Sequence, residues 1–367
     1  MGLFGKKQPK SFLGVDIGAS SIKVVEFGVK KGRPQLLTYG YAELPTDRTG
    51  DSLFDQPKQT GELLARVCKE AGTKSTSAMA ALPTSHVFTS ILSLPNGKDA
   101  RVRQAAVDAE VAKLAPLPLS EMIIQTTYLD EQKKGEKAKK GEQAEKGKEK
   151  QFRAMVTGSA KSFIQKYIEI FKSAKLNLQA IDTESLALVR ALVGKDKGSM
   201  MVIDIGSQRT TLMVVEKGVP FVSRSIQLGG DTVTRVVMQK MGVVEAEAER
   251  IKRDLGLTPE VGSHLAGGLP NILEVLMLPL VNEIRFALQL YASMELAQIK
   301  HVEKVILTGG SSHLPRVAEY LAQTLNVNVY RGDPWARVVY PQDVASVLEE
   351  IGPRLSVAVG LAMREME

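Results

Sequence analysis

Two segments of the chain place an aspartate at the end of an apolar run, followed two residues later by a glycine. The tripeptide Asp-Ile-Gly begins at Asp16 in the first segment and at Asp204 in the second. In a turn of this kind the free backbone N–H groups can bind phosphate oxygens, and the carboxylate can hold Mg²⁺ through water. Two such turns facing each other would hold the phosphates of a nucleotide between two domains.

Polar side chains around both turns extend the phosphate-binding pattern. They are Ser20, Ser21 and Lys23 in the first turn and Gln208, Thr210 and Thr211 in the second. A third glycine turn, Gly309-Gly310, follows the apolar run 305–308. The alternative is a pair of ordinary hairpin turns in which glycine only supplies a positive φ. The repetition and the third turn favour a phosphate site.

Other catalytic and metal-binding templates are missing from the sequence. It contains neither the G-x-x-x-x-G-K-[ST] pattern of a P-loop nor the G-x-G-x-x-G pattern of a dinucleotide site. The four histidines are scattered without ligand spacing and there is a single cysteine, which argues against zinc.

Composition and charge favour a globular protein of a reducing compartment. The chain has 367 residues, of which 44% are hydrophobic, and a net charge of +7. Segment 131–150 mixes Lys and Glu without aromatic residues, so we expect a solvated loop or a frayed helical hairpin there and no nucleic-acid binding. Cys68 has no partner for a disulfide, which favours the cytoplasm. No apolar run is long enough for a membrane span, and residues 1–10 are expected to form a flexible tail.

The apolar patterns around the turns predict an α/β fold in two related halves. Strand–turn–strand units are expected at 12–27 and again at 201–216, which indicates an internal duplication. Helices are expected at 61–71, 161–174, 280–297 and 315–325. Between the two units, strands at 77–82, 87–94, 122–129 and 152–158 accompany a helix at 99–114. We therefore expect residues 80–178 to form an inserted subdomain.

The order of these motifs resembles the actin/Hsp70 ATPase superfamily. Asp16 opens a phosphate-1-like motif, Asp204 a phosphate-2-like motif and Thr308 an adenosine-like motif. Segment 182–192 looks like the first connecting helix and segment 355–363 like the second. The resemblance implies an actin-like ATPase fold with two duplicated lobes and an inserted 1C subdomain of the type found in FtsA.

Within this superfamily the sequence is similar to the PilM family of type IV pilus assembly. The similarity lies in the opening segment 14–26, in segment 224–234 around Gly229-Gly230, in Glu247-Ala-Glu-Arg-Ile-Lys and in 307–310. It implies lobe 1A at 11–79, 179–199 and 351–367, and the 1C subdomain at 80–178. Lobe 2A would comprise 200–230 and 301–350, and subdomain 2B would comprise 231–300.

The turns and the resemblance together predict a site for ATP and Mg²⁺. The resemblance implies catalytic roles for Glu184, near the attacking water, and for Asp204, while Asp16 and Asp204 would hold the metal. The residues expected to bind the nucleotide are Asp16, Gly18, Ser20, Ser21, Lys23, Gly206, Gln208, Thr210, Gly229, Gly230, Glu249, Lys252, Arg253, Gly309, Gly310 and Ser311.

The resemblance implies an ATP-binding adaptor with slow or no hydrolysis. Ser207, Gln208 and Arg209 replace the glycines of fast ATPases. Arg209 could contact phosphate or point to solvent, and we favour solvent. Such proteins bind the N-terminal cytoplasmic tail of PilN between 1A and 1C, at the cytoplasmic face of the inner membrane. Other pilus platform and motor proteins, and further copies of the chain, are implied partners; contact with the membrane would come only through partners.

Three other functions within the superfamily stay open. A kinase would need an aspartate base, for which Asp182 and Asp231 are the candidates. An FtsA-like divisome scaffold would carry an amphipathic membrane helix after its last connecting helix, and this sequence ends at 367 without one. A scaffold of type II secretion is the remaining alternative.

Overall fold

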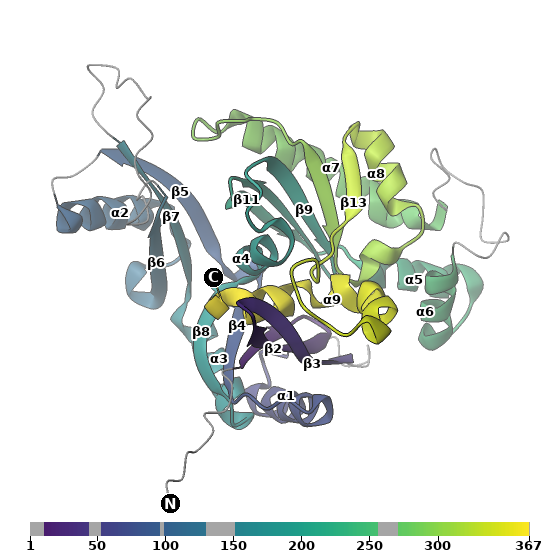
Figure 1. The fold of residues 1–367 in the computed structure, drawn as a ribbon. Coiled ribbons are helices and arrows are strands. Elements are labelled where there is room, and N and C mark those ends of the chain that lie inside the picture. The colour runs from purple at the N-terminus through teal and green to yellow at the C-terminus, as the bar shows by residue number, and fades with distance from the viewer. Residues whose placement is uncertain (1–10, 44–52, 96–98, 130–150, 256–270, 367) are drawn as a thin grey trace, which may run out of the picture. The chain divides into compact units, whose positions relative to one another are not determined.

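The computed structural model describes residues 11–43, 53–95, 99–129, 151–255 and 271–366. The expected tail 1–10 and charged loop 131–150 lie outside the described residues. The chain forms two compact units, one comprising 1–85 and 166–367, the other 86–165 (Figure 1). Among the described residues, no helix has both the length and the apolar character that crossing a membrane requires.

The larger unit contains two five-stranded sheets with the same topology. The first has the order β3-β2-β1-β4-β8, and the second has the order β11-β10-β9-β12-β13. In each sheet, two antiparallel pairings are followed by two parallel ones. The duplication predicted from the sequence is therefore confirmed. The strands of the first sheet are β1 (Phe12–Ile17), β2 (Ser21–Lys30), β3 (Arg33–Glu43), β4 (Ser77–Leu82) and β8 (Asn177–Thr183); those of the second are β9 (Ser199–Ile205), β10 (Thr210–Glu216), β11 (Val219–Ile226), β12 (Lys304–Thr308) and β13 (Asn328–Arg331).

The strand register places the two aspartates at equivalent positions. Asp16 on β1 lies opposite Lys23 on β2, and Asp204 on β9 lies opposite Thr211 on β10. In the first turn, the N–H of the glycine after the Asp-Ile pair donates to the Ser21 carbonyl over 2.9 Å, and its counterpart in the second turn donates to the Arg209 carbonyl over 3.0 Å. Each sheet thus ends its central strand with a carboxylate beside a tight turn.

Two helical segments pack tightly between the lobes. The first is α4 (Glu184–Leu188), which continues as a π-helical turn over Val189–Val193, and the second is α9 (Ala345–Met363). A Cβ atom at Gly14 would collide with the Ala358 carbonyl oxygen on α9, and one at Gly360 would collide with the Ala187 carbonyl oxygen on α4. Both connecting helices are confirmed, although β8 includes the first two residues of the expected range 182–192.

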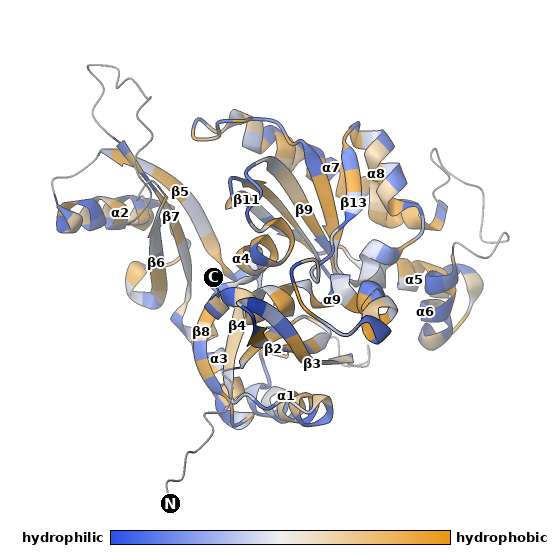
Figure 2. Cartoon of the chain, viewed as in Figure 1, coloured by the Kyte–Doolittle hydropathy of each residue, from blue (hydrophilic) through white to orange (hydrophobic). Residues whose placement is uncertain are grey.

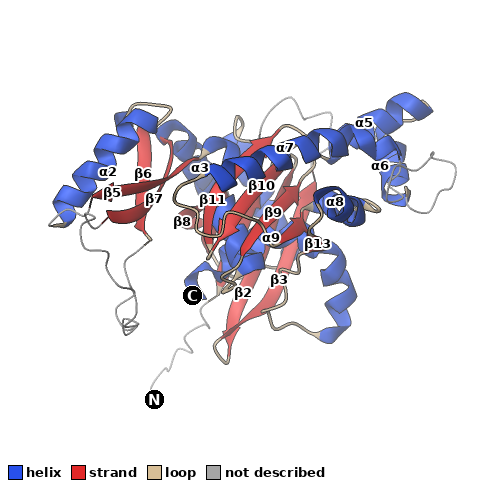
Figure 3. Cartoon of the chain, turned by 90° about the horizontal axis from the view of Figure 1, so that it is seen from above, coloured by secondary structure: helices blue, strands red, loops and turns tan. Residues whose placement is uncertain are grey.

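Of the remaining helices of the larger unit, α1, α7 and α8 pack against strands, whereas α5 packs against α6 and α7. α7 contacts β10 and β11, and Figure 3 shows it lying across this sheet. The strands β9 and β10 are almost entirely buried, and the middle of each is apolar, as the orange colour of β9 in Figure 2 shows. The helices are α1 (Pro57–Ala71), α3 (Lys161–Ser173), whose first residues belong to the smaller unit, α5 (Gly230–Met241), α6 (Glu245–Asp254), α7 (Glu274–Ser293) and α8 (Val317–Leu325).

The smaller unit is a three-stranded antiparallel sheet with a helix on one face. Its strand order is β5-β7-β6, with β5 (Phe88–Pro95), β6 (Met122–Tyr128) and β7 (Gln151–Ala160). Val107 and Val111 of α2 (Ala100–Leu114) are buried against the sheet. This unit is narrower than the expected 80–178, because β4 and β8 pair with each other in the first sheet of the larger unit.

Each sheet of the larger unit also buries a glutamate that binds a neighbouring loop. Glu26 on β2 accepts hydrogen bonds from the N–H groups of Lys74 and Ser75, at 2.8 and 2.9 Å. Glu216 on β10 accepts the Tyr291 hydroxyl at 2.6 Å and the N–H of Gln298 at 3.0 Å. These bonds hold the loops that lead into β4 and β12.

Candidate functional site

A cavity of about 680 Å³ lies in the larger unit, between the two aspartate turns. This volume is within the range of small-molecule and cofactor sites. Residues from both sheets, α6, the third glycine turn and α9 line the cavity. The duplicated topology brings the two turns together, because each turn lies at the same end of its own sheet.

Lys23 and Asp16 form an ion pair at the wall of the cavity. The Lys23 Nζ lies 2.9 Å from Asp16 Oδ2, and Asp16 is only 5% exposed. Burial by itself would lower the pKa of Lys23, but the attraction of Asp16, with smaller contributions from Asp204 and Glu184, raises it. Lys23 is therefore held as a cation beside the first turn, where it can face an anionic ligand.

Asp204 and Glu184 carry carboxylates whose ionised forms are disfavoured. Burial raises the pKa of Asp204 to about 6, and Lys23 opposes this shift. Burial, together with the negative charge of Asp16, raises the pKa of Glu184 to about 7, although its Oε2 accepts the Thr84 N–H at 2.8 Å. Around the two turns, three carboxylates (Asp16, Glu184 and Asp204) thus face two cations, Lys23 and Arg209, and this surplus of acidic groups favours a divalent cation.

The two turn aspartates fit a magnesium site that a ligand completes. Within the described ranges, no cluster of three or more His, Cys, Asp or Glu side chains could hold a metal by itself. Mg²⁺ commonly binds through one or two carboxylates and takes its remaining ligands from phosphate and water. Asp16 and Asp204 meet this requirement because both line the same cavity.

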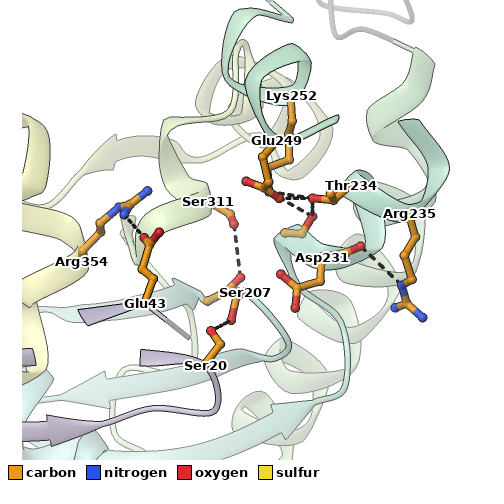
Figure 4. Close-up of polar contacts among 12 residues, drawn as sticks. Ser20, Glu43, Ser207, Asp231, Thr234, Arg235, Glu249, Lys252, Ser311 and Arg354 are labelled. Atoms are coloured by element: carbon orange, nitrogen blue, oxygen red, sulfur yellow. Dashed lines mark hydrogen bonds and ion pairs between the residues drawn. The ribbon is translucent and has the colours of Figure 1, made fainter. Parts of the chain in front are cut away.

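A second polar group, on α5 and α6, lines another part of the cavity (Figure 4). Lys252, only 9% exposed, donates to the Thr234 hydroxyl at 2.9 Å and to Glu249 at 2.5 Å. Burial would raise the pKa of Glu249, but Lys252 outweighs it and the pKa is lowered. Asp231 lines the cavity nearby, and its pKa is raised by burial. These residues present a preorganised set of donors and acceptors to a polar ligand.

The third glycine turn packs directly onto the second aspartate turn. Gly309 has a φ of 85°, and a Cβ atom there would collide with the Asp204 carboxylate. Its N–H donates to the Pro353 carbonyl at 3.0 Å, and the Ser311 hydroxyl donates to the Gly206 carbonyl at 3.2 Å. A glycine is therefore required at 309 both for its backbone conformation and for its close approach to Asp204.

Two polar contacts link different elements that line the cavity. The hydroxyls of Ser20 and Ser207, one from each aspartate turn, lie 2.5 Å apart (Figure 4). Arg354 on α9 donates to Glu43 at the end of β3. Both pairs line the cavity, so a ligand between the turns would face them.

Most of the residues predicted for the site line this one cavity. Those that do are Asp16, Gly18, Ser20, Ser21, Lys23, Glu184, Asp204, Gly206, Gln208, Glu249, Lys252, Arg253, Gly309, Gly310 and Ser311. Thr210 does not line it; its buried hydroxyl donates to the Leu228 carbonyl at 2.7 Å, and Thr211 faces the cavity in its place. Gly229 and Gly230 lie behind the second turn, where the Gly230 N–H donates to the Gly206 carbonyl at 3.0 Å.

The structure adds cavity residues that the sequence motifs did not identify. Pro83, after β4, and the pair Glu43 and Arg354 line it, and no motif marks these positions. The expectation that Arg209 points to solvent is wrong. Its guanidinium lines the cavity and donates to the Ser85 hydroxyl at 2.6 Å. The second turn (Gly206–Arg209) has one residue more than the first (Gly18–Ser20). This difference was the sequence signal that Arg209 could lie in the cavity.

The two aspartates considered as a kinase base lie in different surroundings. Asp182 forms a 2.9 Å ion pair with Arg190 and is not among the residues lining the cavity. Asp231 lines the cavity.

Two sheets of one topology, a carboxylate turn in each and two connecting helices define the actin-like ATPase fold. The family model of the type IV pilus assembly protein PilM matches residues 14–366. The chain therefore belongs to this family, and its role lies in type IV pilus assembly.

Solved structures of two other proteins share this fold. A chain of a PilM-PilN type IV pilus biogenesis complex is 24% identical, with a TM-score of 0.76, and the match covers 97% of this chain and 98% of that one. The ethanolamine utilization protein EutJ of Carboxydothermus hydrogenoformans is 18% identical, with a TM-score of 0.51, over 96% of this chain and 89% of that one. At these identities the likeness concerns the fold.

Two curated relatives of the chain are cell division proteins. The cell division protein FtsA of Bacillus subtilis is 25% identical over 199 residues, which are 49% of this chain and 44% of FtsA. FtsA of Borreliella burgdorferi is 24% identical over 238 residues, 58% of this chain and 54% of that protein. The chain thus spans about half the length of the curated relatives it matches.

Proposed function

We propose that the protein is an ATP-binding adaptor of type IV pilus assembly, which binds Mg²⁺·ATP in the cavity between its two lobes. The observation that carries this proposal is the equivalent placement of Asp16 and Asp204 beside two tight turns on one cavity. Turns of this kind present backbone N–H groups to phosphate, and the aspartates complete a magnesium site.

The two parts of the cavity bind different parts of the nucleotide. Asp16 and Asp204 hold Mg²⁺, while the turns after them, with Lys23, bind the phosphates. At the other part, the nucleoside meets the polar residues of α6 and the third glycine turn, namely Glu249, Lys252, Arg253, Gly309, Gly310 and Ser311.

Hydrolysis in this site is slow or does not occur. Glu184 is the candidate for positioning the attacking water, with Asp204 as the other catalytic residue. Slow hydrolysis is supported by the second turn, where Ser207, Gln208 and Arg209 stand in place of the glycines of fast ATPases. Binding of ATP closes the two lobes, and this change of shape is what the neighbouring proteins recognise.

The partner we propose is the N-terminal cytoplasmic peptide of PilN. Membership of the PilM family and the likeness to a chain of a PilM-PilN complex support this partner. Other platform and motor proteins of the pilus, and further copies of the chain, are additional partners. Through PilN the protein would lie at the cytoplasmic face of the inner membrane.

Calorimetric titration tests the nucleotide site. We expect wild-type protein to bind ATP in the presence of Mg²⁺, and Asp204→Asn to weaken this binding at least tenfold because one metal ligand is lost. The matched control is Asp343→Asn, an exposed aspartate outside the cavity, which should bind like wild type. Wild-type affinity in Asp204→Asn would contradict the proposed magnesium site.

Titration with a synthetic peptide that copies the N-terminal tail of PilN from the same organism tests the partner. We expect saturable binding, and a scrambled peptide of the same composition should not bind. Binding of ATP without binding of the PilN peptide would leave a nucleotide-binding protein with another partner.

A further inference from the structure

Arg209 is a partly buried cation with few protein partners. Its guanidinium donates to the neutral Ser85 hydroxyl at 2.6 Å, and its Nε is buried without a hydrogen-bond partner. Across the described ranges, the structure records no ion pair for this residue. A guanidinium stays charged at any pH the protein meets and carries five N–H donors.

A cation in such a position requires an anion. A partly desolvated charge without a counter-ion is costly, and proteins normally pair it. Glu184 attracts Arg209 at longer range, which lowers the pKa of that carboxyl somewhat, but burial still raises it. The protein therefore leaves most of the donors of Arg209 for a ligand in the cavity that both residues line.

The surroundings of Ser85 contain a second unused polar atom. The Thr84 hydroxyl is buried without a hydrogen-bond partner, while its N–H donates to Glu184 at 2.8 Å. The loop after β4 thus holds Arg209 through Ser85 and holds Glu184 through Thr84. This arrangement fixes a cation and a carboxylate beside the two aspartate turns.

The position of Arg209 determines which part of a bound nucleotide its side chain can reach. It belongs to the second aspartate turn, whereas the polar groups assigned to the nucleoside are on α6 and around Gly309. Arg209 interacts electrostatically with Glu184 and Tyr167, which also feel the charge of Asp16. In a nucleoside triphosphate bound between the turns, the terminal phosphate is the group farthest from the nucleoside.

We infer that Arg209 is a specificity-determining residue that binds the terminal phosphate of ATP and so distinguishes ATP from ADP. This inference rests on the proposed nucleotide function of the cavity. Ser85 holds the guanidinium in place before the nucleotide arrives, which reduces the entropy lost on binding. The terminal phosphate of ATP then takes the remaining donors, in the two-pronged geometry that arginine favours with phosphate.

Calorimetry with two nucleotides tests this inference. The Kd values of Mg²⁺ complexes of AMPPNP, a non-hydrolysable ATP analogue, and of ADP are measured for wild type, Arg209→Ala and Arg209→Lys. We expect Arg209→Ala to raise the Kd of AMPPNP at least tenfold and to change the Kd of ADP less than twofold. Arg209→Lys should recover part of the loss, because it keeps the charge but not the planar fork.

Two controls separate this role from a general effect. Arg285→Ala removes an exposed arginine of α7 outside the cavity, and both affinities should stay at the wild-type values. Ser85→Ala removes only the protein partner of Arg209 and should preserve the preference for AMPPNP. Thermal unfolding without nucleotide shows whether each variant folds.

The outcomes distinguish this inference from the proposed function. If Arg209→Ala weakens the binding of AMPPNP and of ADP equally, or changes neither affinity, Arg209 does not bind the terminal phosphate. The proposed nucleotide site is unaffected by that result. If wild type binds neither nucleotide, both the site and the inference are overturned.

Discussion

Glu184 has an ionised form that the folded protein disfavours in the absence of a ligand. Its pKa near 7 lies well above the ordinary value of a glutamate because of burial and the charge of Asp16. Residues with strongly shifted pKa values gather at functional sites, where side chains suited to function often lower the stability of the folded protein. The cost should appear in the pH dependence of unfolding.

Replacing Glu184 with glutamine should stabilise the nucleotide-free protein at pH 8. The unfolded glutamate ionises near its ordinary pKa, whereas the folded one keeps its proton up to about pH 7. Stability from this group is therefore present below the unfolded pKa and is lost as the pH rises through 7. We expect the free energy of unfolding of Glu184→Gln to exceed that of wild type by about 3 kcal/mol at pH 8 and to match it near pH 4.5, as measured by urea denaturation.

A control on α9 shows whether this effect belongs to the cavity. Glu349 is exposed, and Glu349→Gln should leave the difference from wild type independent of pH. A stability gain for Glu184→Gln that is equally large at both pH values would rule out titration as its cause.

At the scale of elements, α9 depends on close backbone contact with its neighbours. It passes over β1 at Gly14 and against α4 at Gly360, and at either position a Cβ atom would collide with a carbonyl oxygen. The same helix carries Arg354 to the cavity, and its Pro353 carbonyl accepts the N–H of Gly309. The packing of α9 therefore determines the position of one wall of the site.

Substituting Gly360 with alanine should destabilise the protein. The added methyl group meets the Ala187 backbone, so α9 and α4 must move apart. We expect a loss of about 2 kcal/mol in the free energy of unfolding, in the range of overpacked cores. Gly28→Ala is the matched control, because its Cβ would meet only the Leu37 side chain at 3.4 Å. Equal stability of the two variants in urea denaturation would argue against this packing.

The buried Glu216 should be important for the stability of the second sheet. It joins β10 to α7 through Tyr291 and to the following loop through the N–H of Gln298. Glu216→Ala leaves both donors unsatisfied, so we expect a loss of about 3 kcal/mol, against about 1 kcal/mol for Tyr291→Phe. Thermal and urea unfolding measure both values. A smaller loss for Glu216→Ala than for Tyr291→Phe would show that solvent satisfies the freed groups.

At the scale of the whole molecule, nucleotide binding should stabilise the larger unit as one body. Its two sheets contribute to a single cavity, and the Ser20–Ser207 contact joins the aspartate turn of one sheet to that of the other. A ligand that binds only the folded state adds about 2.7 kcal/mol at one hundred times its Kd. We expect Mg²⁺·ATP at that concentration to raise the unfolding temperature by about 5 °C.

Without the metal, the nucleotide should no longer stabilise the protein. With EDTA in place of Mg²⁺, or with Asp204→Asn, the increase in unfolding temperature should largely disappear. An increase that persists under both conditions would place the nucleotide elsewhere.

Local sequence signals were sufficient for most elements of the fold. Strand 77–82 matches β4, and the helix predicted at 61–71 ends at Gly72, as expected for a glycine in the left-handed conformation. The two Asp-Ile-Gly segments correctly indicated duplicated sheets, because a repeat of residue types requires no knowledge of distant contacts. The family followed from the same motifs.

The sequence by itself determined the actin-like fold and the residue types at the two aspartate turns. Only the tertiary structure decided which neighbouring side chain enters the cavity, as with Thr211 instead of Thr210. It also brought Arg209 to Ser85, across 124 positions of the chain. The physical reason is that periodicity and turn residues act locally, whereas strand register and long-range contacts depend on how the sheets and helices pack.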